Sequence, residues 1–256
     1  MDPATLIGVA LAFGAILASM LMEGTSPSAI IIPAALMLVF GGTIGAAMSG
    51  GIMRDTTSLV GALKRAFLAK KSDSSGLVDA MVKLAEKARR EGLLALEDAM
   101  KDVEDPFLRR GLQLAIDGTD SEELREILEG EVEAKRKADK ASAKIFADMG
   151  GFAPTIGIIG TVIGLVHVLE NLSQPETLGH LIAGAFVATL WGVMTANVLW
   201  LPLGNRLKRL CEVECSEMEL VIAGIINIQA GANPRLVAQK LRSLLPPGAA
   251  PKKEAA

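Results

Sequence analysis

The sequence contains no tyrosine, only two cysteines and few aromatic residues. Cys211 and Cys215 lie four residues apart on one segment, so the chain is not a small scaffold held together by disulfides. The net charge of -3 at pH 7 gives no basis for nucleic-acid binding. Hydrophobic residues nevertheless make up 50% of the chain, and the mean hydropathy is +0.40, which excludes intrinsic disorder.

Basic residues are missing from two long parts of the chain. Residues 1–53 and 150–203 contain none of the 26 lysines and arginines. The acidic residues in these two parts flank apolar runs: Asp2, Glu23, Glu170 and Glu176. The chain therefore alternates between apolar and charged zones.

Each apolar zone is divided by a short polar segment that contains a proline. The four resulting apolar runs cover residues 4–22, 28–52, 150–170 and 178–203. Each approaches or exceeds the roughly 20 residues that a helix needs to cross a bilayer core. No basic segment precedes the first run, which argues against a cleaved signal peptide. The sequence therefore predicts an all-α membrane protein with four transmembrane helices.

The distribution of basic residues also predicts the orientation. Lysine and arginine accumulate on the cytoplasmic side of membrane proteins, so residues 54–149 and 204–256 are placed in the cytoplasm, together with both termini. The two cysteines then lie in a reducing compartment, where no disulfide is expected. Their spacing fits either packing on one helix face or a metal site, and the lack of histidine partners favours packing.

The predicted cytoplasmic domain, residues 54–149, has the pattern of helices. Two sets of apolar residues recur at helical spacing: Leu59, Leu63 and Phe67, and Val78, Met81, Leu84 and Ala85. Pro106 is placed to begin a helix. The segment Thr119-Asp120-Ser121-Glu122 fits a capping box that opens a long charged helix ending near residue 148.

The C-terminal part, residues 204–256, is expected to form a cytoplasmic helix over 206–228 and a short helix over 234–244. Its last residues, 246–256, are rich in proline, alanine and lysine, which predicts disorder.

The apolar runs carry no charged residue in their interiors, so the chain alone has no carboxylate with which to carry ions across a membrane. Thr161 and Thr189 are predicted at matched depth near the midplane, because each lies 11 residues from the start of its run. Their hydroxyls fit two roles. They can bond backbone carbonyls one turn back, or they can offer oxygens to a cation or to a partner's carboxylate.

Two further pairs of residues invite both a structural and a functional interpretation. Pro154 and Pro202 lie near the cytoplasmic ends of the third and fourth runs, where a proline either ends a helix or forms a hinge. Arg89 and Glu97 place opposite charges at the two ends of a short apolar turn. Such charges are either solvated or positioned to engage a charged partner surface.

The sequence resembles the flagellar motor stator A subunit, the MotA/PomA family. Five segments carry the resemblance: ARREGLLALE at 88–97, APTIG at 153–157, GTVIGL at 160–165, AFVATLWG at 185–192 and LP at 201–202. They occur in the family's order, with two spans, a charged loop, two spans and a charged tail. The resemblance covers about residues 1 to 245.

This resemblance implies a protein of the bacterial inner membrane that assembles as a homopentamer around two copies of a B subunit. The B subunit supplies an essential membrane aspartate and grips peptidoglycan. Ions pass between the A and B subunits, so residues 150–203 form one wall of the pathway, and residues 54–149 push on the rotor protein FliG. The protein implied is not an enzyme and needs no cofactor, since H⁺ or Na⁺ is transported.

The resemblance also assigns roles to single residues. Arg89 and Glu97 match the charges that contact the rotor, and Pro154 and Pro202 match the prolines that couple ion passage to movement. Thr161 and Thr189 match the two membrane threonines of the sodium-driven branch, which favours Na⁺. The rest of the chain is equally similar to proton-driven relatives, so both ions stay open.

Three alternatives have less support. A non-flagellar, ion-driven energiser of the TolQ/ExbB type usually has three spans and a different loop placement. A membrane enzyme would need a nucleophile with its base, a metal cluster or a phosphate loop, and none stands out. A solute transporter would be expected to show repeats, yet the two pairs of spans share no sequence pattern.

Overall fold

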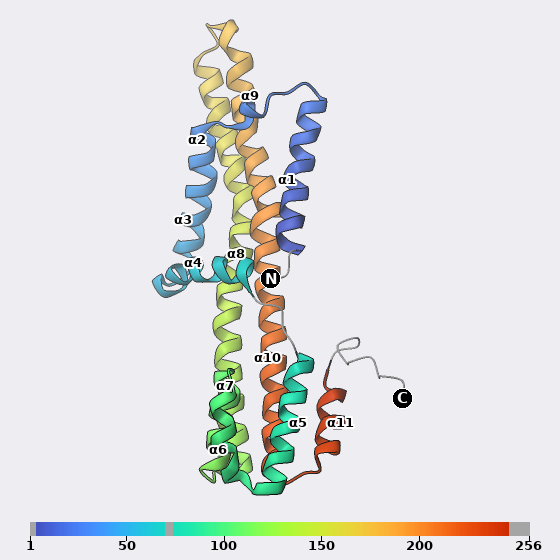
Figure 1. Ribbon diagram of the computed structural model, residues 1–256. Coiled ribbons are helices and arrows are strands. Elements are labelled where there is room, and N and C mark those ends of the chain that lie inside the picture. The colour runs from blue at the N-terminus through green and yellow to red at the C-terminus, as the bar shows by residue number, and fades with distance from the viewer. Residues whose placement is uncertain (1–3, 70–73, 246–256) are drawn as a thin grey trace. The chain divides into compact units, whose positions relative to one another are not determined.

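The computed structural model describes residues 4–69 and 74–245, and this described part is all-helical, as predicted, with no strand in it (Figure 1). Two long helices dominate it, α8 (Ser121–Glu170) and α10 (Leu201–Gln229). The chain divides into two compact units: Met1–Lys70 with Asp139–Leu210, and Lys71–Ala138 with Cys211–Ala256. Each unit has its own hydrophobic core.

The first unit contains the apolar helices. It begins with α1 (Ala4–Met22), none of whose residues is buried. A short 3-10 turn follows, η1 (Pro27–Ile30). The next helical run consists of three consecutive segments: α2 (Pro33–Leu36), η2 (Met37–Gly41, π-helical) and α3 (Gly42–Ser49).

The second apolar run thus forms a shorter helix than the predicted 28–52. Proline favours the first turn of a helix, where its missing N–H costs nothing, and Pro33 occupies that position. The helix extends only to Ser49, about 25 Å at 1.5 Å per residue. Within residues 4–69 and 74–245, three helices are long and apolar enough to cross a membrane: Ala4–Met22, Ser121–Glu170 and Pro175–Gln229.

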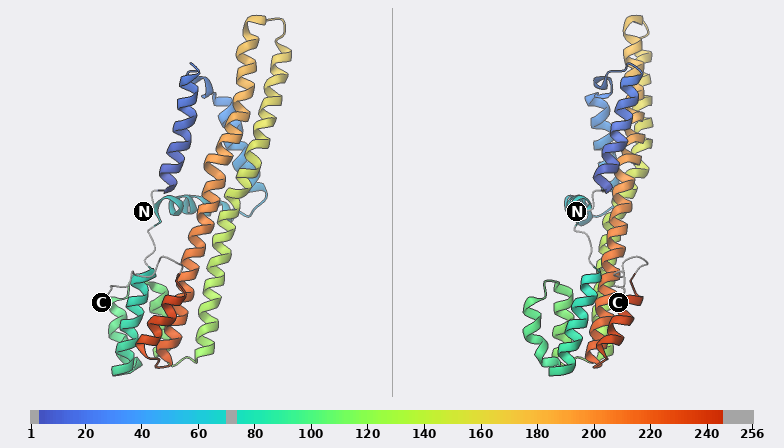
Figure 2. Two further views of the ribbon diagram at one scale, coloured as in Figure 1. Left: turned by 90° about the vertical axis from the view of Figure 1, so that its right-hand side faces the viewer. Right: turned by 45° about the vertical axis from the view of Figure 1, so that its right-hand side comes forward.

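The last of these apolar helices consists of α9 (Pro175–Thr195), a π-helical segment η5 (Ala196–Trp200) and α10. Figure 2 shows α9 running beside the C-terminal part of α8, and hydrogen bonds between the two helices agree with this arrangement. The sequence predicts a charged helix ending near residue 148 and a separate membrane run from 150. Helix α8 instead continues through both without interruption.

Helix α4 (Met53–Leu68) packs on the first unit through alanines. Ala62 and Ala66 are buried in the core, whereas Leu63 is 39% exposed. The predicted apolar face of Leu59, Leu63 and Phe67 is therefore only partly correct: Leu59 and Phe67 pack against this core, and Leu63 does not. Small side chains let the helix backbone approach its neighbours closely, which explains why the alanine face is the buried one.

The second unit is a bundle of short helices around a buried apolar core. Before α8 it contains α5 (Ser74–Glu91), η3 (Leu93–Ala95), α6 (Leu96–Ala99), η4 (Met100–Asp102) and α7 (Pro106–Ile116), and after α10 it contains α11 (Pro234–Ser243). The predicted face of α5 is confirmed, because Val78, Met81, Leu84 and Ala85 are all buried in this core.

The starts of the helices in the second unit follow local capping chemistry. Pro106 opens α7 as predicted, and the carboxylate of Asp105 accepts a hydrogen bond from the backbone N–H of Leu108. Helix α8 begins at Ser121, one residue later than a capping box with Thr119 as the N-cap residue requires. Asp120, not Thr119, accepts a bond from the N–H of Glu122 at 2.9 Å.

The two cysteines are buried in the core of the second unit, with their sulfurs 3.8 Å apart. Neither forms a disulfide within the described residues. No group of three or more potential metal ligands occurs among residues 4–69 and 74–245. Both side chains pack into this core from one face of α10. The predicted disordered end, residues 246–256, lies outside the described residues.

Candidate functional site

The centre of the first unit is built on a close approach of α8 and α9. A Cβ atom added to Gly157 would lie 2.8 Å from the carbonyl oxygen of Ala188, and one added to Gly192 would lie 2.5 Å from that of Ala153. Only glycine fits at this separation, a pattern typical of helix packing in membranes. The glycines therefore bring the two helix backbones, and the side chains beside them, into contact.

Thr161 and Thr189 meet at this approach. Their hydroxyls are hydrogen-bonded to each other. The hydroxyls of both also lie within 3.2 Å of the carbonyl oxygen of Gly157, and that of Thr161 is 3.3 Å from the carbonyl of Ala185. Both side chains are only half-buried. The structure therefore brings together the two residues that the sequence placed at matched depth.

The geometry realises one of the two roles expected for these hydroxyls. Thr161 lies within bonding distance of the carbonyl of Gly157 one turn back, a common arrangement for threonine within a helix. A hydroxyl that donates its proton to a carbonyl still has lone pairs with which to accept or to coordinate. The pair can therefore offer oxygen atoms from its exposed side without losing the backbone contacts.

Neither of the two prolines ends its helix. Pro154 lies inside α8, next to the buried Ala153. Pro202 lies two residues past the end of the π-helical segment η5, within the continuous helix Pro175–Gln229. Proline cannot donate the helical hydrogen bond, so both positions are weak points in the backbone ladder. The helix-end interpretation of these prolines is therefore wrong for this structure.

An aromatic cluster surrounds the two π-helical segments, and the sequence gave little sign of it. The ring of Phe40 in η2 lies 6.1 Å from that of Trp191 and 6.2 Å from that of Trp200, and Phe146 lies 6.4 Å from Trp200. The indole N–H of Trp191 donates to the carbonyl of Ile30 at 2.7 Å. Such contacts tie the second apolar run to α9 and η5.

Two arginines hold the end of α4 against the long helices, a feature that sequence reasoning missed. Arg65 donates two hydrogen bonds to the carboxylate of Asp139, at 2.5 and 2.9 Å. Arg206 donates to the carbonyl of Ala66 at 2.7 Å. Carbonyls in the last turn of a helix lack partners within the helix, so Arg206 satisfies one of them. Arg65 and Asp139 are 74 residues apart in the sequence, so no local sequence pattern could indicate this contact.

Arg89 and Glu97 lie on the surface of the second unit, on either side of a sharp turn. Arg89 is in the last turn of α5 and Glu97 in the first turn of α6. Gly92 makes the turn with a φ of 86°, a conformation that glycine adopts without strain. Leu96 is fully buried and anchors the turn, so the exposed side chains of Arg89 and Glu97 extend from a fixed backbone.

A second charge pair lies next to Glu97. Lys101 donates a hydrogen bond to the carboxylate of Asp98 at 2.8 Å. This bond lowers the pKa of Asp98 and raises the pKa of Lys101, because each charged form is stabilised by the other. Both groups therefore stay charged near neutral pH. Alternating charge on a rigid turn is well suited to electrostatic recognition of a partner.

Comparison with known proteins identifies the family. The profile of the MotA/TolQ/ExbB proton channel family matches residues 99–220, and the profile described as "Motility protein A N-terminal" matches residues 6–92. Motility protein A of Bacillus subtilis is 40% identical over 247 residues, which cover 96% of this chain and 92% of that protein. The chain belongs to the motility protein A family.

Solved structures agree with this membership. A structure of MotAB from C. jejuni superposes with a TM-score of 0.92 at 30% identity, over 97% of both chains. The flagellar MotAB stator complex from Bacillus subtilis superposes with a TM-score of 0.88 at 38% identity, over 96% of this chain and 97% of that one. A family of ion-channel subunits and the three apolar helices of spanning length together identify a membrane protein.

Proposed function

We infer that this chain is an ion-conducting stator subunit of a bacterial flagellar motor, coupling cation influx to rotation of the rotor. The observation that carries this function is the match over nearly the whole chain to motility protein A and to MotAB complexes. The match to the motility protein A N-terminal profile over residues 6–92 disfavours a TolQ/ExbB-type energiser. No cofactor is proposed beyond the transported ion.

The proposed topology has four transmembrane segments in the inner membrane, with both termini in the cytoplasm. The short helix Pro33–Ser49 is proposed as the second segment, because it follows a connection without basic residues, contains no charged residue and precedes the charged residues 54–149. Residues 54–149 and 204–256 are then cytoplasmic, where the basic residues accumulate.

We propose that five copies of the chain form a ring around a B-type subunit. The interiors of the apolar helices contain no acidic residue, so a carboxylate for ion transfer has to come from this partner. Thr161 and Thr189 are proposed to line the pathway, because their half-buried hydroxyls meet on the surface of the α8–α9 pair. Oxygen ligands suit Na⁺ as well as hydrated H⁺, and Na⁺ is favoured by the presence of Thr161.

The proposed coupling runs from the pathway to the rotor. Pro154 and Pro202 interrupt the hydrogen-bond ladders of α8 and α10, which makes them candidate hinges for a change at the ion site. Arg89 and Glu97 are proposed to contact FliG, because both are exposed on a rigid turn. The family's roles for these residues support the proposal.

The decisive experiment is complementation of a strain that lacks its stator. The chain is expressed with its B partner, and swimming is measured in sodium and in potassium buffers of equal ionic strength. Restored swimming supports the stator function, and its dependence on sodium identifies the ion. A chain that restores no swimming with its cognate partner, although both are present in the membrane, contradicts the proposal.

A further inference from the structure

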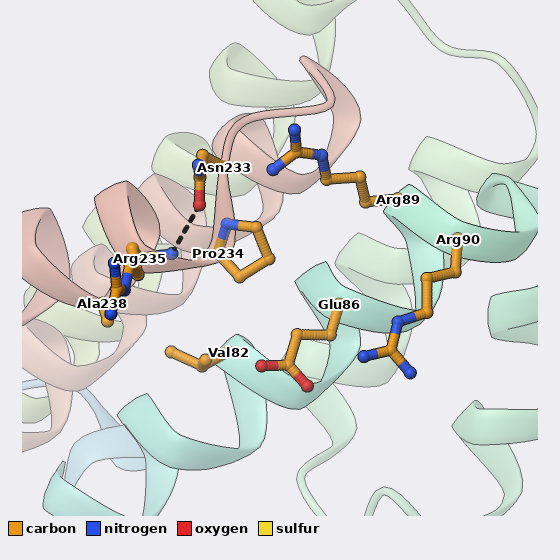
Figure 3. A pocket seen from close by; sticks show the side chains of 8 residues that line it. All are labelled: Val82, Glu86, Arg89, Arg90, Asn233, Pro234, Arg235 and Ala238. Carbon is orange, nitrogen blue, oxygen red and sulfur yellow. Dashed lines mark hydrogen bonds between the residues drawn. The ribbon is translucent and has the colours of Figure 1, made fainter.

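The second unit contains a cavity of about 530 Å³ between the end of α5 and the start of α11 (Figure 3). This volume lies within the range of roughly 300 to 1,000 Å³ that is typical of small-molecule sites. Val82 and Pro234 supply apolar wall, and three arginines, Arg89, Arg90 and Arg235, supply the charge. One carboxylate, that of Glu86, also lines the cavity.

The three arginines differ from the five others of this unit, of which Arg109 donates a hydrogen bond to the carbonyl oxygen of Val103 and four form ion pairs. Arg110, Arg125, Arg136 and Arg242 each form an ion pair with a carboxylate. Among residues 74–245, no such pair occurs for Arg89, Arg90 or Arg235. Three guanidinium groups and one carboxylate leave the cavity with a formal charge of about +2. An excess of this size around a concave surface attracts anions.

The arginines approach the cavity from both of its walls. Figure 3 shows the side chain of Arg89 reaching from the end of α5 toward Asn233 and Pro234, with Arg90 on the α5 side and Arg235 on the α11 side. Asn233 caps α11 by accepting a bond from the backbone N–H of Arg235 at 3.0 Å. The positive charge of the site therefore comes from the guanidinium groups rather than from the end of the helix.

We propose that this cavity binds a polyvalent phosphate anion, in the form of a pyrophosphate group that is either free or part of a nucleotide. A guanidinium presents a planar fork of donors that matches phosphate oxygens in a bidentate manner. A pyrophosphate carries enough negative charge to balance the excess of +2, whereas a single carboxylate balances only half of it. The apolar wall formed by Val82 and Pro234 suits the remainder of a nucleotide.

Occupancy of the cavity has a consequence that rests on the proposed function. Arg89 lines the cavity and is also the residue proposed to contact the rotor. A bound phosphate would engage its guanidinium and withdraw that charge from the rotor partner. The ligand would then weaken the engagement of rotor and stator without altering the ion pathway.

The test measures binding to the purified complex of the full chain with its B partner in lipid nanodiscs. Isothermal titration calorimetry with inorganic pyrophosphate and with ADP separates the free anion from the nucleotide, and citrate serves as a polyvalent carboxylate of similar charge. The variants are Arg90→Gln and Arg235→Gln, which retain the backbone cap of α11. Arg125→Gln is the matched control, because it removes an arginine of the same unit that already has a carboxylate partner.

Support requires that pyrophosphate or ADP binds and that affinity falls as salt rises. Each cavity variant should then weaken binding by roughly ten- to a hundredfold, as expected for the loss of one charged hydrogen-bonding partner, while Arg125→Gln leaves it unchanged. No binding by either phosphate probe overturns the proposal, as does equal binding by the cavity variants. Tighter binding of citrate would assign the site to carboxylates, such as an acidic protein segment, and would also overturn it. Because swimming is not measured, these outcomes are independent of the stator function.

Discussion

Arg65 and Asp139, separated by 74 residues in the sequence, form a doubly hydrogen-bonded ion pair that holds α4 against α8. The exposed fractions of the two side chains are 28% and 14%, so the pair is largely withdrawn from water. Together with the bond from Arg206 to the carbonyl of Ala66, it fixes the end of α4 on the first unit.

Removing one member of this pair should destabilise the protein. Asp139→Asn removes the negative charge that faces the guanidinium of Arg65, and the cost of breaking a partly buried pair is about 2 kcal/mol or more. Thermal unfolding of the purified complex is the measurement. The exposed pair of Lys144 and Asp148 provides the control, since Asp148→Asn should change stability by less than about 1 kcal/mol. Equal effects at the two sites would show that Arg65 and Asp139 contribute no more than a surface pair.

A methyl group at the contact of α8 and α9 should separate the helices. Gly157→Ala places a Cβ within 2.8 Å of a carbonyl oxygen, and overpacking of this kind costs about 1–3 kcal/mol. Gly151→Ala on the same helix has open space around it and should be neutral or slightly stabilising, because alanine favours helices. The thermal midpoint and the yield of assembled complex report both effects. Indistinguishable behaviour of the two variants would refute the close packing.

Loss of the hydroxyl of Thr161 should alter the response to sodium. Thr161→Ala removes an oxygen from the half-buried pair and leaves Thr189 bonded to the carbonyl of Gly157. Swimming speed measured against Na⁺ concentration should then require more Na⁺ to reach half its maximum. Thr155→Ala, which removes an exposed hydroxyl bonded only within its own helix, is the control. Identical Na⁺ curves for Thr161→Ala and the parent would exclude a role in binding Na⁺.

Charge reversal on the exposed turn should impair torque without impairing assembly. Arg89→Glu combined with Glu97→Lys inverts both charges on the rigid support held by Leu96. Tethered-cell rotation should slow several-fold, because electrostatic recognition depends on the sign of each charge. The amount of complex in the membrane is measured in parallel. Full torque from the double variant would show that these two residues do not contact the rotor.

Local patterns in the sequence predict much of this fold. Helical spacing identifies the buried face of α5 through Val78, Met81, Leu84 and Ala85, and Pro106 marks the start of α7. Charge placement separates the apolar helices from the charged ones. Such features depend on residues within one or two turns of each other, so they can be read without tertiary information.

Contacts between distant segments escape a single sequence. The bond between Arg65 and Asp139 joins residues that no local pattern connects, and the cavity beside Arg89 exists only because α11 returns to α5. The sequence also did not predict that α8 continues past residue 150. The change there from charged to apolar residues resembles the boundary between two helices, although the helical backbone is uninterrupted. The contact between Thr161 and Thr189 was predictable only in part. Their matched depth follows from counting residues along each apolar run, whereas their contact depends on how the two helices pack.

The carbonyl oxygen of Gly157 lies within bonding distance of two threonine hydroxyls, one from its own helix and one from α9. Sliding or turning α9 along α8 would separate Thr189 from that oxygen and, at the same moment, from Thr161. Both contacts would be lost together, and the next equivalent position is a full helical turn away, about 5.4 Å. The pair of helices therefore has one preferred register, and any rearrangement at this depth proceeds in a discrete step rather than by gradual drift.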